Sequence, residues 1–279
     1  MIDEIINNPP LPKEGIGKCA LCGKECKLTF EHIPPRAANN SKPAKPVSGA
    51  EYFKKNNRFP WDTSGIKYEN QQKGMGLFSL CQECNNNTGA FYGNDYLEFA
   101  KRAVAMIMSD IPDSHDIVDF KEIYPLRIIK QICSMFCSIN RDLPYLDEMR
   151  KFVLDKESNN FDKKKYRIQM YFNKGNIIKY NGYSCLIFLG SSMIEMSEIV
   201  APPFGFQLII DPKDNEHYNG FNITNFVDCK YNTIATVTMP IVFYEVNNIF
   251  PDDYRSKEEI IAQIEKSEAF KKENNNGTV

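Results

Sequence analysis

The chain has 279 residues, of which 42% are apolar and 25% are charged, which suffices for one large domain or two smaller ones. Its 34 Lys and Arg residues and 36 Asp and Glu residues give a net charge of −2. The overall charge therefore does not indicate a nucleic-acid partner. No apolar run reaches the ~20 residues that a membrane helix needs, and the N-terminus lacks the pattern of a signal peptide. We therefore expect a cytoplasmic protein without a membrane segment.

The charge is unevenly distributed along the chain. Residues 1–90 carry 12 basic and 9 acidic side chains, a balance of +3, whereas the remainder carries 22 and 27, a balance of −5. This asymmetry gives mild support for an anionic partner at the N-terminal end.

Four of the nine cysteines form two pairs with the same spacing, Cys19-x2-Cys22 and Cys81-x2-Cys84. An odd number of cysteines and two Cys-x2-Cys turns favour metal-bound thiolates in a reducing compartment over disulfides. Four thiolates complete the tetrahedral shell of Zn²⁺ and leave no open position for a substrate. We therefore expect a structural zinc. Cys26 is either a spare thiol or an alternative ligand, and the spare thiol is favoured.

Residues 27–34, between the two pairs, alternate in polarity and predict a short strand with Leu28, Phe30 and His32 on one face. His32 is the only histidine among the first 114 residues, and Glu31 lies beside it. A neutral imidazole can take a proton from water near pH 7, and an adjacent carboxylate can hold a divalent cation. A lone histidine on a strand is more often structural, but the flanking cysteine pairs favour a catalytic site.

These residues together resemble the HNH (ββα-metal, His-Me finger) endonucleases. The resemblance covers roughly residues 18–95 and rests on Cys19, Cys22, Glu31, His32, Pro34, Cys81, Cys84, Asn85 and Gly89. It implies a β-hairpin packed on a helix, with His32 as the general base that activates water. It also implies that Glu31 and Asn85 hold a catalytic Mg²⁺, Mn²⁺ or other divalent cation, directly or through water.

The sequence departs from the family pattern at two positions. Many members carry an asparagine that braces the loop of the base where this chain has Gly76, and members with a second histidine ligand have it where this chain has Asn85. Residues 85–88 are also of the types that start helices by accepting backbone N–H groups.

Residues 36–73 form an insertion in which basic side chains alternate with aromatic ones. Such a segment can grip a phosphate backbone and stack on bases, or it can be a solvated loop pinned by its aromatics, and the sequence favours neither. We expect the cluster at Phe59, Pro60 and Trp61 to pack on the zinc-binding region. The candidate nucleic-acid contacts are Arg36, Lys42, Lys45, Lys54, Lys55 and Arg58.

The rest of the chain predicts an α+β region without a recognisable catalytic constellation. Helical periodicity predicts helices within residues 96–154 and from about 256 to 271, and strand patterns at 167–172, 177–180, 183–189, 206–210, 223–226 and 233–246 predict a mostly antiparallel β-rich domain. We thus expect a zinc-binding nuclease domain at 1–95 and a second domain of unknown role at 96–279. His217 lies in a polar turn and is expected to be exposed, as is His115.

We therefore predict a metal-dependent HNH-type endonuclease, a hydrolase that cleaves phosphodiester bonds of DNA, with RNA as another candidate substrate. One alternative is a non-catalytic zinc-finger module that binds nucleic acid or a protein. Another, suggested by fold analogy alone, is a regulated nuclease effector of a defence or toxin system. The C-terminal region is compatible with a homodimer or with a protein partner.

Overall fold

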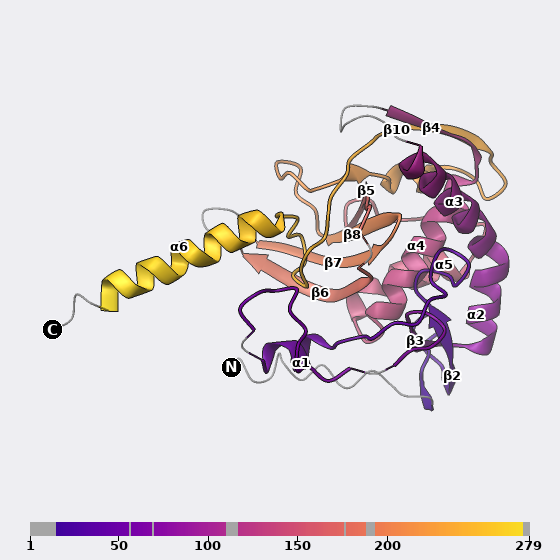
Figure 1. Ribbon diagram of the computed structural model, residues 1–279. Helices are drawn as coiled ribbons and strands as arrows, with labels where there is room; N and C mark the ends of the chain where they lie inside the picture. Colours follow the sequence, from indigo (N-terminus) through magenta and orange to yellow (C-terminus); the bar gives the residue numbers. More distant parts are fainter. Residues whose placement is uncertain are drawn as a thin grey trace.

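The computed structural model describes residues 15–55, 57–68, 70–109, 117–175, 177–187 and 193–275, and these form an α+β fold (Figure 1). The predicted fold class is confirmed: helices pack beside antiparallel sheets, with a cysteine cluster near the N-terminal end. His115 lies outside the described residues.

The N-terminal part is a three-stranded antiparallel sheet followed by a helix, which we call the finger. Its strands are β1 (Ile16–Lys18), β2 (Glu25–His32) and β3 (Gly76–Cys81), and its helix is α2 (Gln82–Thr88). The register of β2 on β3 shifts between Thr29 and Phe30, which leaves Ser79 as an extra residue in β3. Such a β-bulge re-aims a side chain locally.

The helices follow one another closely. Helix α2 continues through the π-helical turn η1 (Gly89–Gly93) into α3 (Asn94–Met108). Helix α4 (Pro125–Ile139) is buried almost all round, and the short turn η2 (Pro144–Leu146) leads into α5 (Asp147–Leu154), which packs beside it. A helix that is apolar around most of its circumference belongs in a core.

The largest sheet has the strand order β6-β7-β8-β5-β9 and is antiparallel throughout. Its strands are β5 (Tyr166–Phe172), β6 (Lys179–Ile187), β7 (Met193–Ala201), β8 (Phe204–Ile210) and β9 (Phe221–Asn222). A separate ribbon pairs β4 (Ile117–Ile123) with β10 (Ala235–Pro240).

One cluster of buried side chains joins these parts. It runs from Cys19 and Leu28 in the finger through α3 and α4 to Ile210 in the large sheet. The boundary predicted at residue 95 falls inside the continuous α2–η1–α3 stretch, and the cluster contains residues from both sides of it. The two-domain division stays a prediction.

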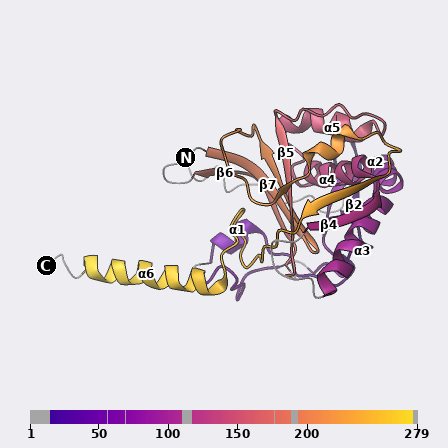
Figure 2. The ribbon, with the colours of Figure 1, turned by 90° about the horizontal axis from the view of Figure 1, so that it is seen from above.

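Several predicted elements differ from those observed. The strand expected at 223–226 is a 3-10 turn, η3 (Thr224–Asp228), in which the Thr224 hydroxyl accepts a hydrogen bond from the Ile168 backbone N–H (2.9 Å). The strand expected at 233–246 ends at Pro240, and β4 and β7 were not predicted. The predicted final helix is present as α6 (Lys257–Asn275), which projects away from the body of the molecule (Figures 1 and 2).

The insertion contains one short helix, α1 (Gly49–Phe53), and otherwise irregular chain. Its aromatic cluster, which was expected to pack on the finger, contacts α6. Phe59 stacks on Trp61 with ring centroids 5.1 Å apart, and the Lys257 ammonium of α6 lies 5.7 Å from the Trp61 ring. Arg58 pairs with Glu268 of the same helix (3.2 Å). The insertion therefore contacts α6.

Candidate functional site

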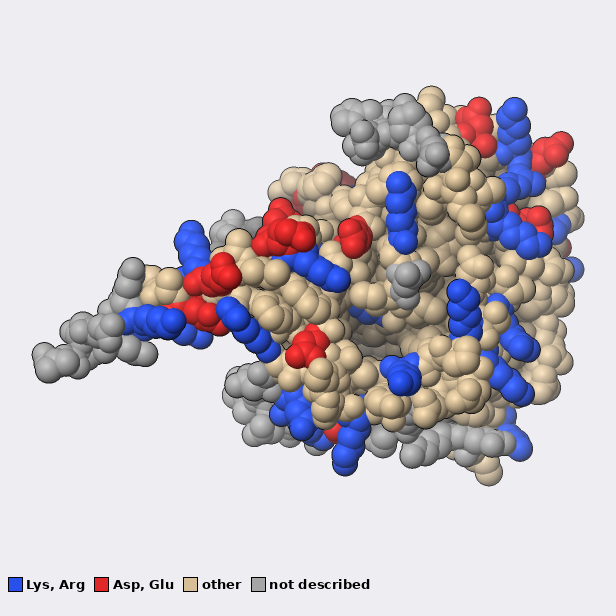
Figure 3. All heavy atoms as spheres, in the orientation of Figure 1, with Lys and Arg blue, Asp and Glu red and all other residues tan. Residues whose placement is uncertain are grey.

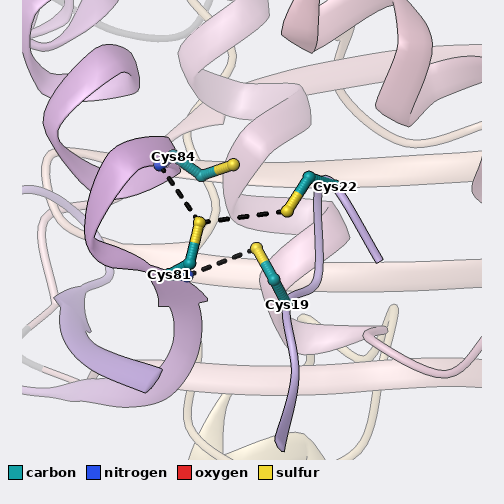
Figure 4. Close-up of side chains that lie close together, drawn as sticks. All are labelled: Cys19, Cys22, Cys81 and Cys84. Carbon is teal, nitrogen blue, oxygen red and sulfur yellow. Dashed lines mark hydrogen bonds between the residues drawn. The ribbon is translucent and has the colours of Figure 1, made fainter. Parts of the chain in front are cut away.

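The four cysteines of the two Cys-x2-Cys pairs come together, as predicted. Cys19 and Cys22 lie on the turn between β1 and β2, whereas Cys81 ends β3 and Cys84 lies in α2. Their Sγ atoms point toward one another (Figure 4) and all lie within 4.8 Å of each other. The Cys22 and Cys81 Sγ atoms are 3.9 Å apart. Bonds of ~2.3 Å to a central zinc give tetrahedral S···S distances of this size, so the cluster could hold a metal ion such as zinc.

The chemistry of the cluster also suits a metal. A hydrogen bond from the Cys84 thiol lowers the pKa of Cys19, which favours the thiolate, the form that ligates metals. Cys26 lies outside the four-thiol cluster, and its thiol donates to the Lys24 carbonyl oxygen (3.4 Å).

His32 is the last residue of β2, and its ring is held in a defined tautomer. Its Nε2 lies 3.0 Å from the Lys73 carbonyl oxygen. A carbonyl oxygen only accepts, so Nε2 carries the proton and Nδ1 of the neutral ring is a free base. Burial lowers the pKa of His32, and the nearby Arg36 guanidinium lowers it further against the opposing effect of Lys73. The neutral form therefore dominates at pH 7.

The loop that carries Lys73 is fixed to the segment after His32 by Asn40, which the sequence analysis did not single out. The Asn40 amide group donates to the carbonyl oxygens of Pro34 and Met75 (both 2.7 Å) and accepts from the Met75 N–H (2.7 Å). The side chain is buried. Asn40 thus holds this loop in place, and it does so from the insertion rather than from position 76.

Glu31 is buried at 5% exposure on the strand beside His32. Its Oε2 accepts hydrogen bonds from the Ser79 hydroxyl (3.0 Å), on the bulge of β3, and from the Ser138 hydroxyl of α4. Burial raises the pKa of the carboxyl group to about 7, against the lowering effect of the two hydroxyls. Both bonds reach the same oxygen, which leaves Oε1 with no hydrogen bond from the described residues.

Asn85 lies within α2 and faces β2. Its Nδ2 donates to Thr29 Oγ1 (2.9 Å) and to the Phe30 carbonyl oxygen (3.4 Å). It does not start the helix, because the N-cap is Cys81, whose sulfur accepts from the Cys84 N–H. The Asn85 carboxamide oxygen is therefore the atom that is left for a ligand.

The predicted catalytic residues His32, Glu31 and Asn85 line one cavity of about 240 Å³ between the finger and α4. Gln131 of α4 is a wall residue that sequence reasoning missed. Its side chain is 3% exposed, and its buried Oε1 accepts no hydrogen bond from the described residues. Its helical spacing from Ser134 and Ser138, in a mostly apolar helix, was the available signal. The lining consists of Phe30, Glu31, His32, Pro35, Arg36, Asn85, Thr88, Gly89, Gly93 and Gln131.

The six candidate nucleic-acid contacts are all exposed, but they are not equivalent. Arg36 lines the cavity, whereas Lys54 pairs with Glu51 and Arg58 pairs with Glu268. The Lys45 ammonium lies 5.0 Å from the Tyr68 ring. Lys42 and Lys55 are exposed on the same insertion. Arg36 is thus the basic residue that the fold brings to the predicted catalytic residues.

Among the described residues, none of the helices combines the length and the apolar composition needed to cross a bilayer. His217 is exposed, as predicted. Comparison with protein-family models, curated proteins and solved structures found no match. Functional inference therefore depends on the geometry of the site.

Proposed function

We propose that the protein is a metal-dependent endonuclease of the HNH type that hydrolyses phosphodiester bonds of DNA. The observation that carries the proposal is the His32 ring, whose Nε2 is held by the Lys73 carbonyl oxygen while the ring lines a cavity shared with Glu31 and Asn85. A base with one nitrogen fixed and the other free is suited to activate water.

In the proposed reaction, His32 Nδ1 takes a proton from a water molecule whose oxygen forms the new bond to phosphorus. The bond from phosphorus to the 3′-oxygen breaks, and that oxygen leaves with a proton from solvent, giving a 5′-phosphate and a 3′-hydroxyl. Arg36, which lines the same cavity, would bind a nonbridging phosphate oxygen.

The Glu31 carboxylate and the Asn85 carboxamide oxygen would hold the divalent cation. Oxygen ligands of these kinds suit Mg²⁺ or Mn²⁺. When bound, such a cation supplies stabilisation of the negative charge on the phosphate and the leaving oxygen. The four cysteines would hold zinc and so keep the strand with the base and the helix with Asn85 in fixed positions.

The surface offers partial support for a nucleic-acid partner. Figure 3 shows a face that is hollowed near its centre, with Lys and Arg side chains on several sides of the hollow. The basic side chains do not merge into one continuous patch in this view. A substrate held by a few phosphate contacts is expected to bind weakly, and its affinity should fall with salt less steeply than that of a protein with many such contacts.

A binding module without catalysis is the competing function. It is favoured by the hydrogen bonds of Glu31 Oε2 to two serines and of Asn85 Nδ2 to β2, which give both side chains structural roles. Salt-sensitive DNA binding without cleavage, with one zinc retained, would support this module.

Plasmid nicking by the wild-type protein and by His32→Ala tests the proposal. We expect wild type to nick DNA with Mg²⁺ or Mn²⁺ and to stop when chelator is added, because the cation stabilises the transition state. His32→Ala should lose at least ~100-fold in rate, the typical contribution of a positioned base.

The matched control is His217→Ala, since His217 is exposed and is not among the residues that line the cavity. It should nick DNA as wild type does. Zinc content and thermal unfolding should be the same in all three proteins. Equal inactivity of wild type and His32→Ala, with one zinc in each, would instead favour the binding module.

A further inference from the structure

One residue that lines the cavity has a buried acceptor atom without a donor among the described residues. Gln131 Oε1 accepts no hydrogen bond from the described residues, although its side chain is 97% buried and lines the cavity with Glu31 and Asn85. A buried polar atom without a partner destabilises the folded state. A group outside the described residues is therefore expected to lie against this oxygen.

Gln131 belongs to a polar stripe on α4. Gln131, Ser134 and Ser138 are spaced i, i+3 and i+7, which places them on one face of a helix whose other positions are mostly apolar and buried. Ser134 Oγ is also buried and without a partner among the described residues, whereas the Ser138 hydroxyl donates to Glu31 Oε2. The stripe therefore runs along the side of α4 that meets the finger.

The charge at this place also lacks compensation. The Glu31 carboxyl group forms no ion pair with a described Lys or Arg side chain, and its hydrogen bonds come from neutral hydroxyls. A buried carboxylate is stabilised when a cation lies beside it. Glu31, Asn85 and Gln131 present one carboxylate and two carboxamides to the same cavity, and hard divalent cations prefer ligands of this kind.

We propose that Gln131 is a third protein ligand of a divalent cation held by Glu31 and Asn85, so that a helix outside the finger completes the metal site. The inference rests on the proposed function, in which Glu31 and Asn85 hold the catalytic cation. It gives the C-terminal region a direct part in the site, because α4 lies beyond the residues that resemble the HNH pattern.

The test measures Mn²⁺ binding to the zinc-loaded full chain, by electron paramagnetic resonance of free Mn²⁺ or by calorimetry. Gln131→Leu removes the oxygen with little change in volume and should weaken Mn²⁺ binding by about tenfold or more, since even indirect partners of a metal contribute 10–100-fold. Gln131→Glu should bind Mn²⁺ as tightly as wild type or more tightly, because it replaces a neutral oxygen ligand by an anionic one.

Gln169→Leu is the matched control. Gln169 is also buried, at 5% exposure, and its Oε1 also lacks a partner among the described residues, but it lies on β5 and does not line the cavity. This variant should bind Mn²⁺ as wild type does. If Gln131→Leu fails to retain zinc, Gln131→Met removes the same oxygen with a different shape and is expected to give the same loss.

The outcomes separate this inference from the proposed function. If a folded Gln131→Leu or Gln131→Met protein binds Mn²⁺ as tightly as wild type does, the ligand assignment is wrong. Cleavage of DNA by the wild type would in that case still support the proposed endonuclease. Absence of any Mn²⁺ site in the wild type also overturns it. If Mn²⁺ binding depends on Gln131 but the wild type does not cleave DNA, the cation site is supported and the proposed endonuclease activity is contradicted.

Discussion

At Gly76 the neighbouring backbone leaves no room for a side chain. A Cβ atom at this position would lie 2.1 Å from the Glu31 carbonyl oxygen, a backbone atom that cannot move without displacing β2. We predict that Gly76→Ala lowers the free energy of unfolding by more than ~2 kcal/mol, as overpacking of a core does. Urea unfolding of the zinc-loaded protein measures the change.

Gly89→Ala provides the comparison for Gly76→Ala. An added Cβ at Gly89 meets no atom within 4 Å, and its backbone is helical. Alanine there should leave the free energy of unfolding unchanged or raise it by ~0.5–1 kcal/mol. Equal stability of the two variants would mean that β2 and β3 do not approach each other at Gly76 as described.

The same residue illustrates the limit of reasoning from positions along the chain. In the family pattern an asparagine at position 76 would hold the loop near the base. In this chain Asn40, from the insertion, makes the hydrogen bonds that hold the loop. Local sequence did not distinguish Asn40 from the many other asparagines of the chain. Its role depends on the closeness of Pro34 and Met75, which are 41 residues apart in sequence and meet only in the fold.

At the scale of elements, the finger depends on its four thiols. Cys81 joins β3 to α2, and its backbone N–H donates to Cys19 Sγ (3.3 Å) across the cluster. We predict that Cys81→Ser loses zinc and unfolds the finger, because zinc binding contributes directly to the free energy of folding at such sites. Metal analysis and thermal unfolding monitor the two effects.

Cys26→Ser is the matched control for Cys81→Ser, since Cys26 lies near the cluster but outside it. It should keep one zinc per chain and the stability of the wild type. If Cys81→Ser retained its zinc while Cys26→Ser lost it, Cys26 would replace Cys81 in the ligand set.

The sequence patterns identified several helices and strands that the fold buries deeply. Helices α3 and α4 lie almost entirely within the region 96–154 that was predicted to be helical, and strands β5 and β8 were predicted close to their observed bounds. Strand β7 was missed because Glu195 and Glu198 interrupt its apolar run. Glu198 is tolerated in the core because the Lys179 ammonium of β6 lies 2.8 Å away and two tyrosine hydroxyls donate to it. These contacts join residues that are distant in sequence, so no local sequence pattern predicts them.

At the scale of the whole molecule, the finger is tied to the rest by polar contacts as well as by the shared core. The Ser138 hydroxyl donates to Glu31, the Tyr180 hydroxyl donates to the Ile33 carbonyl oxygen, and Arg150 Nε donates to the Ala20 carbonyl oxygen (2.9 Å). The sequence analysis assigned no role to these partners, because each lies more than 100 residues from the group that it contacts.

We therefore predict that residues 1–95 do not fold alone, even with zinc. Separation would expose the apolar side chains that meet α4 and would leave Glu31 without Ser138, so the fragment would lose burial and a charge-assisted hydrogen bond together. Its amide NMR spectrum should lack the dispersion of the full chain. By contrast, a chain that ends at residue 256 should stay folded, because Ile260 is the one buried residue of α6 among those whose side chains are described.

If the zinc-loaded fragment of residues 1–95 gave a dispersed spectrum, the finger would instead be an independent domain. The contacts with α4 would then serve the site rather than the fold.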